Sequence, residues 1–150
     1  MASPASVSLV VEDDEFLKRS EHGAIWGTVY FQIGETVTFP GAGWTDLVAA
    51  FVVAWLEGLC RVAEGAVLWE RIPFFDGPCA VEITTLRDGL VELRFIHKDK
   101  VEASATVTLR DMLANARSVA KDLLSKCQQK SWNNNDTEVL TNLIHFRGLN

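Results

Sequence analysis

The sequence predicts an α+β fold in which a mostly antiparallel sheet of about six to seven strands packs, on one face, against two main helices, with a short C-terminal helix beside them. One observation behind this prediction is an apolar segment of helical length at residues 47–59. Another is a series of strand-like segments between residues 66 and 109, followed by an apolar period typical of a helix. With 150 residues, 48% of them hydrophobic, the chain is predicted to form a single domain over residues 1–150.

Strands are expected on the N-terminal side of the apolar helix. Residues 7–11 and 24–33 are rich in β-branched side chains, and the second segment also contains aromatic ones, which favours extended structure. A turn at residues 34–35 leads into a returning strand at residues 36–39. A proline and two glycines within residues 40–43 then interrupt the sheet before the helix.

The apolar helix is the most distinctive element of the chain. Ten consecutive apolar residues, from Leu47 to Leu56, lie between Asp46 and Glu57. A helix that is apolar on every side has to be covered on more than one side. The run is too short to cross a bilayer, which requires roughly 17–25 apolar residues. We therefore predict the central helix of a core, or a helix shared with a partner, and no association with a membrane. Gly65 is expected to end this helix.

Consecutive strands should follow the helix, and the hairpin at their centre can be predicted in detail. A three-residue loop at residues 87–89 places Ile83 opposite Leu93, so that apolar side chains share one face. A two-residue turn would instead place Ile83 opposite Arg94. The longer loop needs a residue with positive φ at its third position, which Gly89 provides. The strands are predicted at residues 66–72, 78–86, 90–96 and 101–109.

The last part of the chain is predicted to contain a long and a short helix. Thr108 and Asp111 have the spacing of a capping box at the start of a helix. Apolar side chains then recur at helical spacing through residues 111–128. A loop around residues 132–136 should separate this helix from a short one at residues 137–146, because consecutive asparagines favour turns.

The charge distribution restricts the class of partner. The net charge is −6, and residues 1–109 contain 16 acidic and 8 basic side chains, a balance of −8. Such an acidic body argues against nucleic acid as the primary ligand, since contacts with phosphates supply most of the non-specific affinity for nucleic acids. It is compatible with a basic protein partner, and it also serves solubility.

The sequence lacks the motifs of common catalytic and nucleotide-binding sites. It contains neither a GxSxG nor an HExxH pattern. Gly41 and Gly43 lie between a strand and a helix, as in dinucleotide-binding loops, but Asp46 stands where that fingerprint has a third glycine. None of the histidines has a second ligand at the spacing of a metal site on a helix. We therefore predict no catalytic residue, no cofactor and no metal.

The cysteines indicate a reducing compartment. Their number, three, is odd and their spacing is wide, which excludes a full set of disulfides and a CxxC site. Cys60 and Cys79 lie in apolar surroundings and are predicted to be buried, reduced thiols. The N-terminal residues contain no basic side chain before their apolar run, so they lack the form of a secretory signal. These features predict a cytoplasmic location.

Acidic and aromatic side chains are the candidates for contact with a partner. Trp26 and Tyr30 share one face of a predicted strand, opposite its aliphatic side chains, and are therefore available to a partner or to a covering helix. Asp76 follows two aromatic residues, although Asp-Gly-Pro is also a common turn sequence. The full set of candidates is Glu12, Asp13, Asp14, Glu15, Trp26, Tyr30 and Asp76. The tryptophans predicted to lie in the core are Trp44, Trp55 and Trp69.

Several short motifs occur in an order that points to a known class of proteins. They are Phe39-Pro40, Trp44-Thr45-Asp46 before the apolar helix, Trp55-Leu56 within it, Phe74-Phe75-Asp76-Gly77-Pro78 before a strand, and Cys127 with the later Trp132. In this order the chain, from about residue 26 to residue 145, resembles small uncharacterised bacterial proteins, among them immunity proteins of toxin delivery systems. The resemblance implies a domain that binds a cognate toxin domain, and it transfers no catalytic residue.

The sequence thus leads to one principal functional hypothesis and two alternatives. The principal hypothesis is a non-catalytic immunity protein that covers the active cleft of a basic bacterial toxin domain with acidic and aromatic side chains. The first alternative is a small-ligand-binding protein or enzyme with a pocket between sheet and helix, near Trp26, Tyr30 and Asp76. The second is a homodimeric structural protein that buries the second side of the apolar helix. A cavity with converging polar groups would favour the first alternative.

Overall fold

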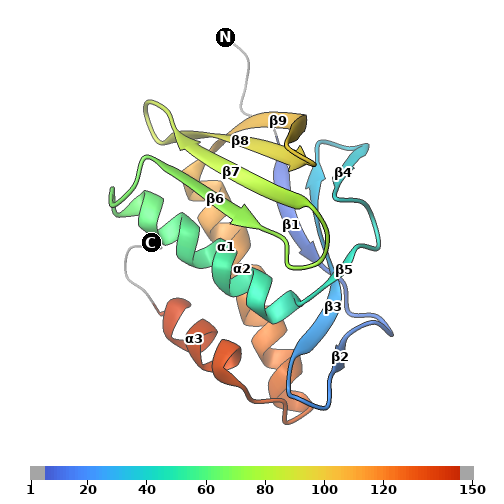
Figure 1. Ribbon diagram of the computed structural model, residues 1–150. Coiled ribbons are helices and arrows are strands. Elements are labelled where there is room, and N and C mark those ends of the chain that lie inside the picture. The colour runs from blue at the N-terminus through green and yellow to red at the C-terminus, as the bar shows by residue number, and fades with distance from the viewer. Residues whose placement is uncertain (1–5, 146–150) are drawn as a thin grey trace.

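Within residues 6–145, which a computed structural model describes, the chain forms nine strands in two antiparallel sheets and three helices (Figure 1). The prediction of an α+β fold is confirmed. The prediction of a single sheet of six to seven strands is wrong, because the described strands divide into a five-stranded and a four-stranded sheet. The elements are β1 (Val7–Val11), β2 (Lys18–Arg19), β3 (Ile25–Ile33), β4 (Val37–Phe39), β5 (Thr45–Asp46), α1 (Val48–Ala63), β6 (Trp69–Pro73), β7 (Cys79–Thr85), β8 (Leu90–His97), β9 (Lys100–Thr108), α2 (Leu109–Gln129) and α3 (Asn135–Leu143).

The five-stranded sheet is built around β3, because the other four strands of this sheet all pair with it. β1 and β4 correspond to predicted strands, and they place Val7 opposite Ile33 and Phe39 opposite Phe31. The sequence prediction contains neither β2 nor β5, which have two residues each. A segment this short carries no periodic pattern and becomes a strand only through its partner.

The four-stranded sheet follows the chain in the order β6-β7-β8-β9. Its central hairpin has the predicted register, with Ile83 opposite Leu93 and Val81 opposite Phe95. Gly89 has a φ of 75°, as the three-residue loop requires, and Asp88 also has a positive φ, of 56°. The alternation of apolar and polar side chains was therefore sufficient to fix the length of this loop.

Replacing Gly89 by valine should lower the free energy of unfolding by about 1–2 kcal/mol, because a β-branched residue resists positive φ. Gly41→Val is the matched control. Neither glycine has an atom within 4 Å of the position that a Cβ would take, but only Gly89 has a positive φ. Urea unfolding of both variants measures the difference, and an equal loss of stability in both would contradict this account of the loop.

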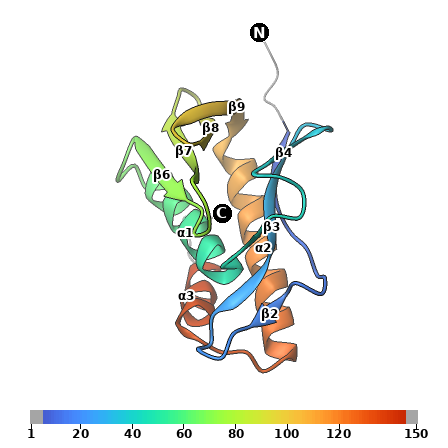
Figure 2. The same cartoon turned by 45° about the vertical axis from the view of Figure 1, so that its right-hand side comes forward.

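α1 is covered on several sides, as its composition predicts. It contacts α2, α3, β3 and β6, and Figure 2 shows α1 and α2 on the inner side of both sheets. The indole of Trp55 is fully buried and meets the ring of Phe31 edge-on, with 4.8 Å between the ring centroids. Gly58 lies against β6, where a Cβ would approach the Ile72 side chain to 2.9 Å. Within residues 6–145, no helix combines the length and the apolarity needed to span a membrane.

Side chains cap the beginnings of α2 and α3. The Thr108 hydroxyl accepts a hydrogen bond from the Asp111 N–H at 3.1 Å, as the predicted capping spacing requires. Asn134 caps α3 in the same way by accepting from the Thr137 N–H at 2.9 Å. α3 therefore begins at Asn135, before the predicted position 137, and it ends at Leu143. The predicted end of this helix, Phe146, lies outside the described residues.

A side chain of α2 satisfies the backbone of Leu9 at the free edge of β1. The Leu9 N–H donates to Asn115 Oδ1 at 2.7 Å, and Asn115 Nδ2 donates to the Leu9 carbonyl at 3.3 Å. One amide side chain thus makes the two hydrogen bonds that a neighbouring strand would otherwise make. This contact joins residues 106 positions apart and ties the five-stranded sheet to α2.

Candidate protein-interaction site

The acidic run at residues 12–15 lies in the loop between β1 and β2, which projects from the body of the molecule (Figure 1). Three of its carboxylates are held by neighbouring side chains. The Tyr30 hydroxyl donates to Glu12 at 2.7 Å, and the Thr28 hydroxyl donates to Asp14 at 3.1 Å. Lys126 on α2 forms an ion pair with Asp13 at 3.7 Å. The loop therefore has a defined shape and keeps most of its negative charge in fixed positions.

The same loop presents an apolar side chain, which sequence reasoning missed. The Phe16 N–H donates to Asp14 Oδ1 at 3.0 Å, so the carboxylate shapes the turn that carries Phe16. The Phe16 side chain is 48% exposed, whereas the next residue, Leu17, is buried. A phenylalanine that directly follows four acidic residues was the available signal, but the sequence does not reveal whether Phe16 or Leu17 enters the core.

Trp26 and Tyr30 lie on the outward face of β3, as the alternation along this strand predicts. Ile25, Val29 and Phe31 are buried on its other face, while Trp26 and Tyr30 are half-buried. The hydrogen bond to the Glu12 carboxylate raises the pKa of Tyr30, with smaller contributions from burial and from the negative charge. Tyr30 is therefore a neutral donor at physiological pH, and it fastens the acidic loop to the sheet.

Asp76 belongs to a different structural unit. Its side chain is exposed, and its backbone N–H donates to the carboxylate of Asp46 at 3.2 Å. Asp46 is fully buried and also accepts from the Trp44 indole at 3.1 Å and from the Leu47 N–H at 2.7 Å. Gly77 completes the contact, because a Cβ there would approach the Trp44 ring to 2.9 Å. The structure thus brings Glu12, Asp14 and Tyr30 together, whereas Asp76 is part of a turn fastened to the start of α1.

A cluster of aromatic side chains joins the segments around this turn. The ring of Phe74 stacks on Phe51 of α1 at 4.2 Å and meets Phe39 edge-on at 6.1 Å. Trp44 meets the same ring at 6.4 Å. The motifs at residues 39–40, 44–46 and 74–78, which are far apart in sequence, therefore form one connected unit. Their residue types are explained by packing and by the buried Asp46.

Two cavities among residues 6–145 do not coincide with the pocket that the first alternative requires. One cavity of about 90 Å³ lies between the C-terminal part of α2 and α3, with Cys127, Trp132 and Thr137 in its wall. A second, of about 40 Å³, lies between β1 and α2. Neither is lined by Trp26, Tyr30 or Asp76. Both are well below the roughly 300–1,000 Å³ of typical small-molecule sites.

The described residues provide no reactive thiol or metal cluster. Cys60, Cys79 and Cys127 are buried and free of disulfides, which confirms the prediction for Cys60 and Cys79. Burial, together with nearby carboxylates, raises the pKa of Cys60 to about 11, and burial also raises the pKa of the other two thiols. Within residues 6–145, no three His, Cys, Asp or Glu side chains are grouped so that they could hold a metal ion.

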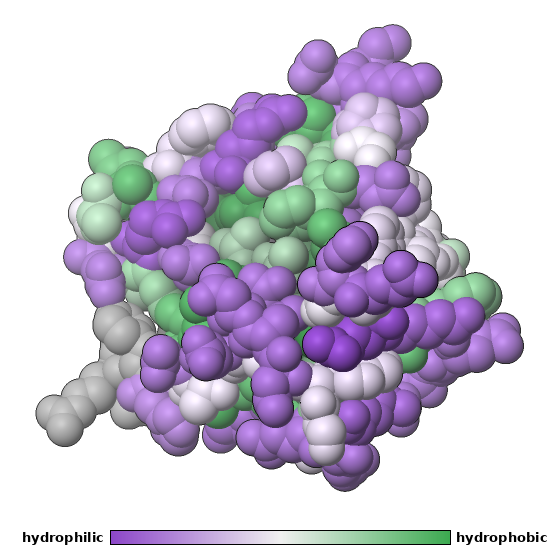
Figure 3. Space-filling model, turned by 60° about the horizontal axis from the view of Figure 1, so that its bottom comes forward, coloured by the Kyte–Doolittle hydropathy of each residue, from purple (hydrophilic) through white to green (hydrophobic). Residues whose placement is uncertain are grey.

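The accessible part of α1 is narrow. Ala50, Ala54, Glu57 and Arg61 follow one side of the helix and are half-buried, while the other sides are covered. α1 lies at the front of Figure 1, and the upper middle of Figure 3 shows apolar side chains in a hollow that polar residues surround. The half of this stripe nearer the N-terminus offers only alanine side chains, so it contains no large apolar anchor for a second copy.

The predicted core tryptophans have different environments. Trp55 is fully buried and Trp44 is half-buried, but Trp69 is 51% exposed, so the prediction for Trp69 is wrong. Trp69 lies on the outer face of β6, on the side of the four-stranded sheet away from the helices. A strand at the edge of a sheet can have an aromatic side chain on its outer face, and the sequence of β6 does not reveal which face is covered.

No protein-family model, no curated protein and no solved structure matches the chain. The motifs that carry the resemblance to immunity proteins lie largely in the buried aromatic cluster and its turns. They describe how the chain folds. The exposed atoms of the acidic loop and of Phe16, in contrast, are not explained by packing within the chain.

Proposed function

We propose that this protein is a non-catalytic binding domain of the immunity-protein type, which blocks a basic toxin domain with its β1–β2 loop. The observation that carries the proposal is an exposed aromatic side chain, Phe16, directly after four acidic residues, three of which contact side chains of β3 or α2. Buried aromatic anchors surrounded by complementary charge are typical of tight protein interfaces.

The loop would act in two ways. Its negative charge attracts a basic partner over a distance and raises the association rate, an effect that salt screens. Phe16 then enters an apolar pocket of the partner and slows dissociation. Because the hydrogen bonds to Tyr30 and Thr28 already hold the loop, little conformational entropy is lost on binding.

Charge reversal at the loop should slow association with the partner. The partner is first captured from a lysate of the source cells and identified, and binding kinetics are then recorded over a salt series. Asp13→Lys with Glu15→Lys should lower the association rate by about tenfold at low salt, and the difference should vanish at high salt. Glu12 and Asp14 are left unchanged because their hydrogen bonds to Tyr30 and Thr28 hold the loop, whereas the exposed ion pair between Asp13 and Lys126 contributes little to its shape. Phe16→Ala should instead accelerate dissociation.

Glu35→Lys with Glu64→Lys is the matched control. Both glutamates are exposed, and the change in net charge is the same. This variant should retain nearly all of the association rate, because its charges lie outside the loop. Association that ignores salt, or that both charge-reversed variants slow equally, would contradict recognition by the β1–β2 loop.

The two alternatives receive less support from the geometry. A ligand pocket near Trp26, Tyr30 and Asp76 would need these side chains to converge, but Asp76 is fastened to Asp46 while Tyr30 is bonded to Glu12. A homodimer through α1 was motivated by the apolar sides of this helix, and α2, α3, β3 and β6 already cover them.

A further inference from the structure

The outer face of the four-stranded sheet carries exposed apolar side chains at one end. Trp69 is 51% exposed and Leu86 is 42% exposed. Trp69 lies opposite Thr84 on the outer face of β6, and Leu86 lies just beyond the end of β7, two residues after Thr84. Leu68, which is 72% exposed, lies at the adjacent rim, where its carbonyl accepts from the Thr85 N–H. These three residues form what we call the Trp69 patch.

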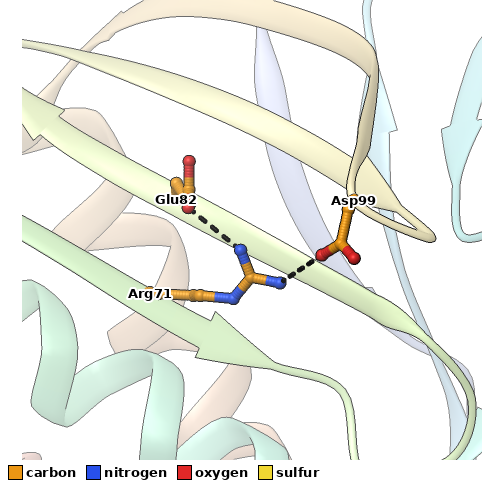
Figure 4. Close-up of polar contacts among 3 residues, drawn as sticks. All are labelled: Arg71, Glu82 and Asp99. Carbon is orange, nitrogen blue, oxygen red and sulfur yellow. Dashed lines mark hydrogen bonds and ion pairs between the residues drawn. The ribbon is translucent and has the colours of Figure 1, made fainter.

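Charges of alternating sign lie next to this patch. Arg71, Glu82 and Arg94 stand opposite one another on β6, β7 and β8, in the order positive, negative, positive. Arg71 bridges Glu82 at 3.1 Å and Asp99 at 3.7 Å, and Figure 4 shows its guanidinium between the two carboxylates. Arg94 pairs with Glu92 at 2.8 Å. This part of the surface is therefore close to neutral, although the chain as a whole has a charge of −6.

We propose that a second copy of this chain packs on this face, with the Trp69 patch and the charged row in a two-fold interface. Two acidic chains repel unless the surfaces that meet are neutral, and this face meets that condition. The row is also partly complementary to itself, because a shift by one strand places Glu82 of each copy over an arginine of the other copy. Trp69 and Leu86 then provide the apolar anchors. The inference goes beyond the proposed function and uses a different surface from the β1–β2 loop.

The oligomeric state of the purified full chain tests this inference. Sedimentation velocity over a concentration series should show a reversible dimer. Trp69→Ala should raise the dimer dissociation constant by at least about tenfold. Phe75→Ala is the matched control, because Phe75 has the same exposed fraction, 51%, but lies in the loop between β6 and β7. This control should leave the dimer unchanged.

Charge and stability measurements make the test specific. Arg94→Glu converts the row to positive, negative, negative and should also weaken the dimer, while thermal unfolding should show that each variant stays folded. A chain that remains monomeric up to about 1 mM overturns the inference, as does a dimer that Trp69→Ala and Phe75→Ala affect equally. Trp69→Ala should leave association of the basic partner with the β1–β2 loop unchanged, so failure of this inference is distinguishable from failure of the proposed function.

Discussion

Replacing Asp46 by alanine should lower the free energy of unfolding by about 3–5 kcal/mol, a large part of the stability of an ordinary domain. Asp46 is fully buried, and its carboxylate accepts hydrogen bonds from Trp44, Leu47 and Asp76. Alanine would leave these three donors without their acceptor at a position where the Asp46 side chain itself is fully buried. Chemical unfolding followed by circular dichroism should therefore show a larger loss of unfolding free energy for Asp46→Ala than for an alanine substitution at any other acidic residue.

Asp76→Ala is the matched control for this prediction. The two aspartates share one hydrogen bond, but only the backbone of Asp76 takes part in it, and its side chain is exposed. We expect a change within about 0.5 kcal/mol for Asp76→Ala. Asp46→Asn should fall between the two, because the amide keeps one acceptor oxygen but places an NH₂ group against donors. Equal stability of Asp46→Ala and Asp76→Ala would mean that Asp46 does not hold the turn.

Trp55→Ala should cost about 3–5 kcal/mol for a different reason, the loss of a large buried side chain at the centre of the core. The indole is fully buried and packs on Phe31 from the sheet. Its Nε1 has no hydrogen-bond acceptor, so this tryptophan contributes through packing rather than through a polar contact. A thermal unfolding series should show a lower melting temperature for Trp55→Ala together with an undiminished amount of secondary structure at low temperature.

Trp69→Ala is the control that shows whether the loss of stability in Trp55→Ala comes from burial or from the residue type. Trp69 is the same kind of residue next to a similarly apolar segment, but it is 51% exposed. Its substitution should change the stability of the monomer by no more than about 0.5 kcal/mol. Trp55→Phe should lose less than Trp55→Ala, because most of the apolar volume remains and the unpaired donor is removed. A melting temperature unchanged in Trp55→Ala would show that this side chain is not part of the core.

The register of the hairpins could be predicted because the side-chain period of a strand is strict. Ile83 and Leu93 had to share a face, and only the three-residue loop ending in Gly89 allowed it. The position of α1 followed from its unbroken apolar run. Both features are determined by residues that are close in sequence, and a periodic pattern of apolar side chains is therefore enough to predict them.

The division into two sheets could not be predicted in the same way. Pairing between strands is a contact between distant segments, and an apolar pattern shows which face is buried but not which edge is paired. The exposure of Trp69 and Phe16 was hidden for a related reason, since each lies close in sequence to a residue of the core or packed against it. Val67 precedes Trp69 by two positions, and Leu17 directly follows Phe16. The acidic run was identified, but its hydrogen bonds to Tyr30 and Thr28 depend on the alignment of β1 with β3.

The amide of Asn115, which bonds the backbone of Leu9 at the edge of β1, bears on the order in which the sheet and its partner are synthesised. Leu9 leaves the ribosome early, but its partner side chain is synthesised 106 residues later. Until then the growing chain exposes an unpaired strand edge, the kind of surface that pairs with other nascent chains. At a translation rate of roughly 5–20 residues per second this interval lasts on the order of ten seconds. The Leu9 backbone groups at this edge therefore gain their side-chain partner only after α2 has been synthesised.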